Sequence, residues 1–182
     1  MVEICHTSFT TVMMKINRLL IVIIIILSPL NSMAENENLE LYEGKWIEQC
    51  KDGQKENEKN CALERSLFVD KEMKRKLITI VMQTNSLTKE VRFILISPLG
   101  TLIQSGVKIG FDGNLINQNG FGFNICQQYG CITTLKMTEN ILNNFKKAKN
   151  LNLEYLNAQG RKIDIDFGLK GFTEQYKKIS VN

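Results

Sequence analysis

The residues of this sequence whose type and spacing could support chemistry are its cysteines. Cys50, Cys61, Cys126 and Cys131 follow an N-terminal leader, and such thiols form disulfides, hold a metal ion or carry out redox exchange. The members of the two sequence-adjacent pairs are separated by ten and four residues, whereas zinc and redox sites favour Cys-x-x-Cys spacing. We therefore predict two disulfides, and proximity pairs Cys50 with Cys61 and Cys126 with Cys131. A long-range pairing such as Cys50 with Cys126 is the alternative.

A second set of candidate groups is the carboxylate pair Asp164 and Asp166, which lies on one face of a strand if the segment is extended. Two neighbouring carboxylates are the machinery of glycoside hydrolysis. Alternation along an amphipathic strand explains both residues equally, and we favour it. The single histidine, His6, lies in the leader, so the chain beyond it has no Ser-His-Asp or Cys-His pair. We expect no catalytic residue, no metal and no cofactor.

The leader has the layout of a secretory signal peptide. A basic segment, Lys15–Arg18, precedes the apolar run Leu19–Leu27, which is shorter than the roughly 20 residues of a membrane span. Small residues at Ser32 and Ala34 predict cleavage after Ala34. Export agrees with an even number of remaining cysteines. The predicted organisation is a signal peptide at 1–34, a flexible acidic segment at 35–44 and one domain at 45–182.

Basic residues form three clusters in the exported part, at 74–76, at 146–149 and at 177–178. A nucleic-acid surface needs a denser basic stripe with interleaved aromatic residues, so no nucleic-acid partner is expected. Each cluster is explained as a solvated surface. A weak attraction to an anionic membrane surface is compatible with them.

The elements that must position these residues are mostly strands, because short apolar runs alternate with turn signals. The run Leu77–Met82 is continuously apolar, which predicts burial on both faces or a place at the centre of a sheet. The segment Gly120–Leu135 reads as a hairpin that Cys126 and Cys131 staple near its tip. Tyr129, at that tip, is a candidate contact residue or a cover for the disulfide. The other predicted strands are Trp46–Cys50, Ala62–Val69, Glu90–Ile96, Val107–Phe111, Asn152–Asn157 and Arg161–Phe167.

Two segments change to helical periodicity. Thr138 is a good N-cap, and an apolar stripe at Ile141, Leu142, Phe145 and Ala148 predicts a helix of about three turns. Near the C-terminus, a second apolar stripe predicts a short closing helix; it consists of Leu169, Phe172 and Tyr176. Many short strands with one mid-chain helix and a short C-terminal helix predict a mainly β fold, a β-sandwich.

An ordered set of motifs resembles the invasion-associated locus B (IalB) family of exported bacterial proteins. These motifs are Trp46 with Cys50, Cys61, Pro98-Leu99-Gly100 with Gly106-Val107, Asp112-Gly113, Phe123, Cys126, Gly130-Cys131 and Gly171-Phe172-Thr173. The resemblance implies an immunoglobulin-like β-sandwich and export by a Gram-negative bacterium. Some members of that family are linked to host-cell invasion and to the cell envelope, and the resemblance carries over no catalytic residue.

The leader, the paired cysteines and the resemblance together predict an exported, non-enzymatic binding protein. We expect it in the periplasm or on the outer surface, with a protein partner in the envelope or on host cells. One alternative is a periplasmic accessory or chaperone-like protein that serves envelope integrity. The other is a carboxylate-based hydrolase that uses Asp164 and Asp166.

Overall fold

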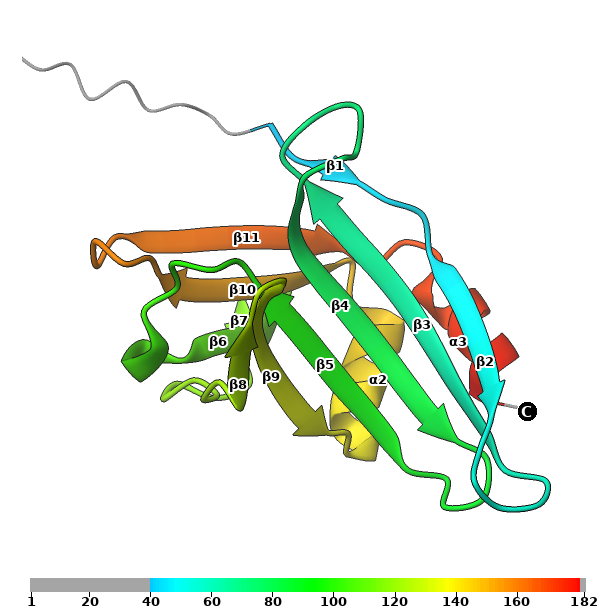
Figure 1. The fold of residues 1–182 in the computed structure, drawn as a ribbon. Helices are drawn as coiled ribbons and strands as arrows, with labels where there is room; N and C mark the ends of the chain where they lie inside the picture. The colour runs from blue at the N-terminus through cyan, green and yellow to red at the C-terminus, as the bar shows by residue number, and fades with distance from the viewer. Residues whose placement is uncertain (1–39, 181–182) are drawn as a thin grey trace, which may run out of the picture. The chain divides into compact units, whose positions relative to one another are not determined.

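The computed structural model describes residues 40–180, so the predicted signal peptide at 1–34 lies outside the described residues. Within them the chain is mainly β, with two antiparallel sheets and two α-helices (Figure 1). The predicted mainly β sandwich with one mid-chain helix and a short C-terminal helix is confirmed.

The larger sheet has seven strands in the order β1–β3–β4–β5–β9–β8, and β2 also pairs with β3. Strands β1 and β2 pair with different segments of β3, so both lie along the same side of it. The strands are β1 (Tyr42–Glu43), β2 (Ile47–Asp52), β3 (Lys59–Phe68), β4 (Lys76–Asn85), β5 (Val91–Ser97), β8 (Ile125–Gln127) and β9 (Gly130–Lys136).

The smaller sheet has four strands in the order β11–β10–β6–β7. They are β6 (Val107–Phe111), β7 (Asn114–Leu115), β10 (Asn150–Leu156) and β11 (Lys162–Gly168), and a 3₁₀ turn, η1 (Ile103–Ser105), precedes β6. Strands β10 and β11 form a regular hairpin with seven pairs in register, from Asn150 opposite Gly168 to Leu156 opposite Lys162.

Helix α2 (Glu139–Lys147) begins where the sequence predicts, because the Thr138 side chain accepts a hydrogen bond from the Ile141 amide at 3.3 Å. An acid in its first turn and lysines in its last turn complement the helix dipole. Helix α3 (Phe172–Ser180) closes the chain and buries Phe172, Tyr176 and Ile179.

Phe145 is the residue at which the layers meet. It comes from α2, is 2% exposed, and packs against Phe93 of the larger sheet, Phe111 of the smaller sheet and Phe172 of α3. The ring centroids lie 4.9–5.4 Å apart, in the range of tilted and edge-to-face aromatic pairs. The two helices and the smaller sheet therefore cover the same face of the larger sheet.

Arg65 is a charged residue on the core side of β3, where its side chain is 10% exposed. Its guanidinium group donates to the Gly44 carbonyl at 2.8 Å, to the Gly168 carbonyl at 2.5 Å and to the Glu43 carboxylate at 2.6 Å. The group also lies 5.3 Å from the ring of Trp46. Arg65 thus ties β3 to the N-terminal strand and to the end of β11.

Tyr42 and Glu43 lie in the segment 35–44, which the sequence predicts to be flexible. They form β1 opposite Phe68 and Leu67, and Arg65 holds Glu43. The continuously apolar run in β4 is central in its sheet, which is one of the two placements that the sequence predicts. The other placement, burial on both faces, does not hold at Val81, which is only partly buried.

Replacing Arg65 by methionine should lower the free energy of unfolding by about 3 kcal/mol, because the partners of the guanidinium group lose their hydrogen bonds. Arg65→Lys should also lower the free energy of unfolding by a large part of this amount, because an ammonium group cannot make the same three contacts. Urea denaturation measures both. The control is Arg75→Met, whose side chain is 74% exposed and whose ion pair should contribute under about 1 kcal/mol. Equal midpoints for the Arg65 and Arg75 variants would contradict this role.

Candidate binding face

One face of the larger sheet is left uncovered by the helices and the smaller sheet. Leu63, Met82 and Phe93 point to the covered side and are buried, whereas their neighbours Val81 and Ile94 lie in register on the other side and are partly exposed. We call this second side the open face. A hollow of about 720 Å³ lies on it, lined by side chains from β2, β3, β4, β5, β9 and the β8–β9 turn.

The middle of the hollow is apolar. Val81 of β4 is in register with Ile94 of β5, and Ile96 is in register with Ile132 of β9. All four side chains are partly exposed. β-branched residues on a half-covered strand face are common, but two such pairs on neighbouring strands that line one hollow form an apolar strip.

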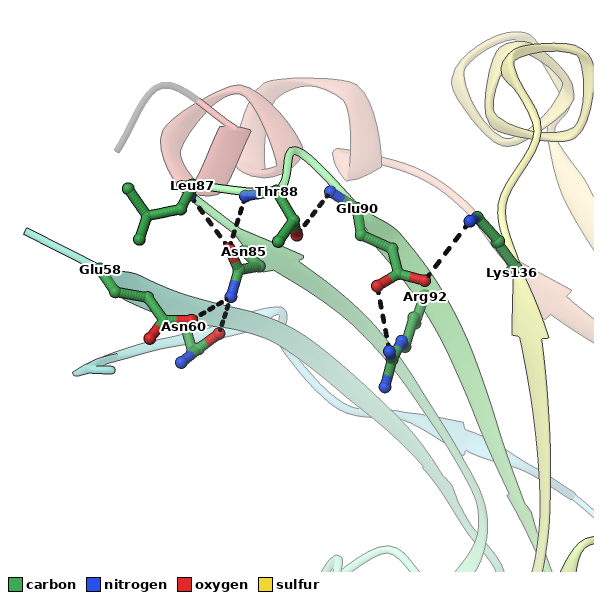
Figure 2. Close-up of polar contacts among 8 residues, drawn as sticks. All are labelled: Glu58, Asn60, Asn85, Leu87, Thr88, Glu90, Arg92 and Lys136. Carbon is green, nitrogen blue, oxygen red and sulfur yellow. Dashed lines mark hydrogen bonds and ion pairs between the residues drawn. The ribbon is translucent and has the colours of Figure 1, made fainter. Parts of the chain in front are cut away.

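One end of the hollow is polar and is organised by Asn85 (Figure 2). Its Nδ2 donates to Glu58 at 2.5 Å and to Asn60 at 2.9 Å, and its Oδ1 accepts from the amides of Leu87 and Thr88. Asn85 therefore shapes its own turn and joins it to the β2–β3 loop. The hydrogen bond from Asn85 is the main cause that holds the pKa of Glu58 below its usual range.

Next to Asn85, the polar end of the hollow also contains charged side chains, at the start of β5. Arg92 donates to Glu90 at 3.0 Å, and Lys136 of β9 lies 3.7 Å from the same carboxylate (Figure 2). The hydrogen bond from Arg92 is the largest cause that lowers the pKa of Glu90. Glu90 and Arg92 both line the hollow, so a partner at this end would meet an ion pair that is already formed.

Tyr129 stands at the other end of the hollow. It is 58% exposed and lines the hollow, so its side chain is accessible to a partner. The next residue, Gly130, has φ of 141° and lies so close to the Ser97 carbonyl that a Cβ atom would clash with it. Glycine is therefore required to seat the hairpin tip against the end of β5.

The two disulfides brace the sides of the larger sheet. Cys50 and Cys61 are directly opposite in the β2–β3 pair, and Cys126 and Cys131 are directly opposite in the β8–β9 pair, with Cα separations of 4.0 and 3.9 Å. Strands β2 and β8 are the outermost strands on the two sides of the hollow. The predicted pairing is confirmed, and the Cys50–Cys126 alternative is wrong.

The carboxylate pair lies elsewhere. Asp164 and Asp166 are exposed on β11 of the smaller sheet, where Asp164 pairs with Lys162 at 3.0 Å and Asp166 accepts from Asn152 at 2.6 Å. Neither residue lines the hollow. Within residues 40–180, no three His, Cys, Asp or Glu side chains gather as metal ligands would. Across the same residues, no helix has the length and apolar character to span a membrane.

Sequence reasoning places Tyr129 at a hairpin tip but does not assemble the hollow. No sequence pattern brings Asn85 and Glu58 together, because their contact joins residues 27 apart. The available signal is the polar residue on the uncovered side of each central strand, Gln83 in β4 and Arg92 in β5. That signal marks a face exposed to water and does not reveal its concavity.

The fold and this face define a class of protein, a β-sandwich with two cross-strand disulfides and an open, hollowed sheet face. The chain belongs to the invasion associated locus B (IalB) protein family, whose sequence profile matches residues 46–180. It is similar in structure to invasion associated protein B from Bartonella henselae, with a TM-score of 0.64, 21% identity, and coverage of 77% of this chain and 93% of that chain. The predicted family is confirmed, and the fold is shared with the Bartonella protein. No curated protein matches the sequence.

Removing each disulfide by a pair of serine substitutions should destabilise the domain unequally. The chain-entropy model gives about 3 kcal/mol for the Cys50–Cys61 loop and about 2 kcal/mol for the shorter Cys126–Cys131 loop. Urea denaturation of the two variants and of the oxidised parent protein measures the difference. A non-reducing digest that yields a peptide joining Cys50 to Cys126 would contradict the pairing itself.

Stability should fall at both ends of the pH range. Hydrogen bonds lower the pKa values of Glu58, Asp70, Glu90 and Glu154, so their contribution is present above about pH 4.5 and is lost as the pH falls through the folded-state values. Burial raises the pKa of Tyr155 to about 12, so its contribution is complete below pH 10 and is lost above it. Melting temperatures should therefore be level between about pH 5 and 9. A melting temperature unchanged at about pH 3 would refute the carboxylate contribution.

Proposed function

We propose that the protein is an exported, non-enzymatic binding protein of the bacterial envelope, and that it contacts its partner through the open face. The observation that carries the proposal is the hollow on that face, which combines an apolar strip with a polar end and an exposed tyrosine. Protein-binding surfaces have this composition, an apolar centre with a polar rim. Membership of the IalB family supports a role in association with host cells.

The composition of the hollow supports binding. Tyrosine is enriched among residues that dominate binding energy, and Tyr129 projects beside the apolar strip from a rigid, disulfide-braced turn. The apolar strip consists of Val81, Ile94, Ile96 and Ile132, and a partner would remove its area from water. Since Asn85 and the Glu90–Arg92 pair are held by neighbours, little side-chain order has to be created on binding.

Four observations support export and a role other than catalysis. The leader has a signal-peptide pattern, and the cysteines outside it form cross-strand disulfides, which persist in oxidising compartments. The chain beyond His6 contains no histidine. The Asp164 and Asp166 carboxylates are engaged by Lys162 and Asn152 on a strand away from the hollow.

Tyr129→Ala should weaken capture of the partner by about 30-fold, the loss expected for a hot-spot residue. Ile132→Asp should abolish capture, because it places a charge in the middle of the apolar strip. The measurement is quantitative pull-down from envelope fractions and from host-cell surfaces with the exported form of the protein. Met73→Ala is the matched control, since Met73 is 47% exposed and lies outside the hollow.

Capture that survives both Tyr129→Ala and Ile132→Asp, in variants that keep the parent melting temperature, would reject the open face as the binding surface. Cell fractionation distinguishes a role at the host surface from an accessory role in the periplasm. Protein that is accessible to protease on intact cells supports contact with the host. Protein that is released only by osmotic shock supports the periplasmic accessory role instead.

A further inference from the structure

Two lysine clusters that are about 30 residues apart in the sequence come together on the helical side of the domain. The end of α2 packs on the start of α3, where the Thr173 hydroxyl donates to the Lys146 carbonyl at 3.0 Å. The Lys146 ammonium group also lies 5.3 Å from the ring of Tyr176. We call the exposed side of residues 139–149 and 170–180 the helical face.

The helical face is basic, because its lysines outnumber its acidic residues. Its two segments contain six lysines against Glu139 and Glu174. Within residues 40–180, no ion pair involves Lys147, Lys149 or Lys177. The basic cluster at 74–76 differs, because Arg75 pairs with Asp70 and Lys76 pairs with Glu64.

The helical face and the open face lie on opposite sides of the larger sheet. Phe172, Tyr176 and Ile179 of α3 are buried in the core cluster that also holds Leu63, Met82 and Phe93 from the covered side of the larger sheet. Figure 1 shows α2 and α3 behind the strands of the larger sheet. A large planar partner that covers the helices would therefore leave the hollow accessible.

We propose that the helical face docks on the surface of an anionic phospholipid bilayer and holds the domain with its open face directed away from that surface. Positive charge on a flat, solvated face complements the negative potential of such a bilayer. The residues are all lysines, which act as mobile point charges and suit a surface of laterally mobile headgroups, whereas arginine suits a partner that needs bidentate geometry.

The chemistry of the helical face argues against the other polyanions. Nucleic-acid surfaces stack bases on exposed aromatic rings, but Phe145, Phe172 and Tyr176 are at most 5% exposed. The large exposed apolar side chains within residues 40–180 all lie outside α2 and α3. Docking is therefore electrostatic and does not insert side chains into the bilayer, so it should be reversed by salt.

The test is co-sedimentation of the exported form of the protein with phosphatidylcholine vesicles that do or do not contain phosphatidylglycerol. Binding is expected only with phosphatidylglycerol, and it should be lost when the ionic strength rises from about 0.1 M to about 1 M, which shortens the screening length from about 10 Å to about 3 Å. The triple variant Lys147→Gln, Lys149→Gln, Lys177→Gln should reduce the partition coefficient about 100-fold, at about 5-fold per lysine.

The matched control removes the same charge elsewhere, by Lys55→Gln, Lys71→Gln and Lys74→Gln, at three exposed residues outside the helical face. It should reduce binding only slightly. Equal losses in the two triple variants would overturn the proposal, because they would indicate a dependence on net charge alone. Equal binding to vesicles with and without phosphatidylglycerol would also overturn the proposal. So would loss of binding to a DNA duplex, with binding to vesicles kept, in the triple variant of Lys147, Lys149 and Lys177. Partner capture that depends on Tyr129 should be unchanged in both triple variants, so failure here leaves the proposed function standing.

Discussion

The contact that the rest of the structure depends on is the burial of the Arg65 guanidinium group between the two sheets. A charge in that position is costly unless it is paired and hydrogen-bonded, and Arg65 donates from all three of its nitrogens, to Gly44, Gly168 and Glu43. These partners come from the N-terminal strand and from the end of β11. The arginine therefore sets how the smaller sheet meets the larger one, and it gives the start of the domain its only described ion pair with β3 within residues 40–180.

With the smaller sheet and both helices gathered on one side, the larger sheet keeps its other side free. Its outermost strands are braced by Cys50–Cys61 and Cys126–Cys131, so the open face can stay exposed without a second layer. The same arrangement brings α2 against α3 and concentrates lysines there. The domain thus presents two chemically different surfaces, one hollowed and partly apolar, the other basic.

Features that depend on neighbouring residues were predictable. The strands predicted at Val107–Phe111 and Arg161–Phe167, the Thr138 cap of α2 and the pairing of cysteines across short loops all follow from local rules, and the structure confirms them. Strand β1 was not predictable, because two residues in an acidic segment become ordered only when Glu43 meets an arginine 22 residues away. The hollow was not predictable either, since Asn85 and Glu58 meet only after β3 and β4 have paired.

The sequence by itself determined the family, the mainly β class, the disulfide pairs and the lack of histidine beyond His6, because each is a matter of residue type and spacing. Only the tertiary structure decided which side of β4 and β5 stays open, where Tyr129 points, and that the lysines of α2 and α3 share one face. The physical reason is that each of these depends on contacts between distant segments, and such contacts are set by how the buried surfaces fit together and not by the pattern along any one strand or helix.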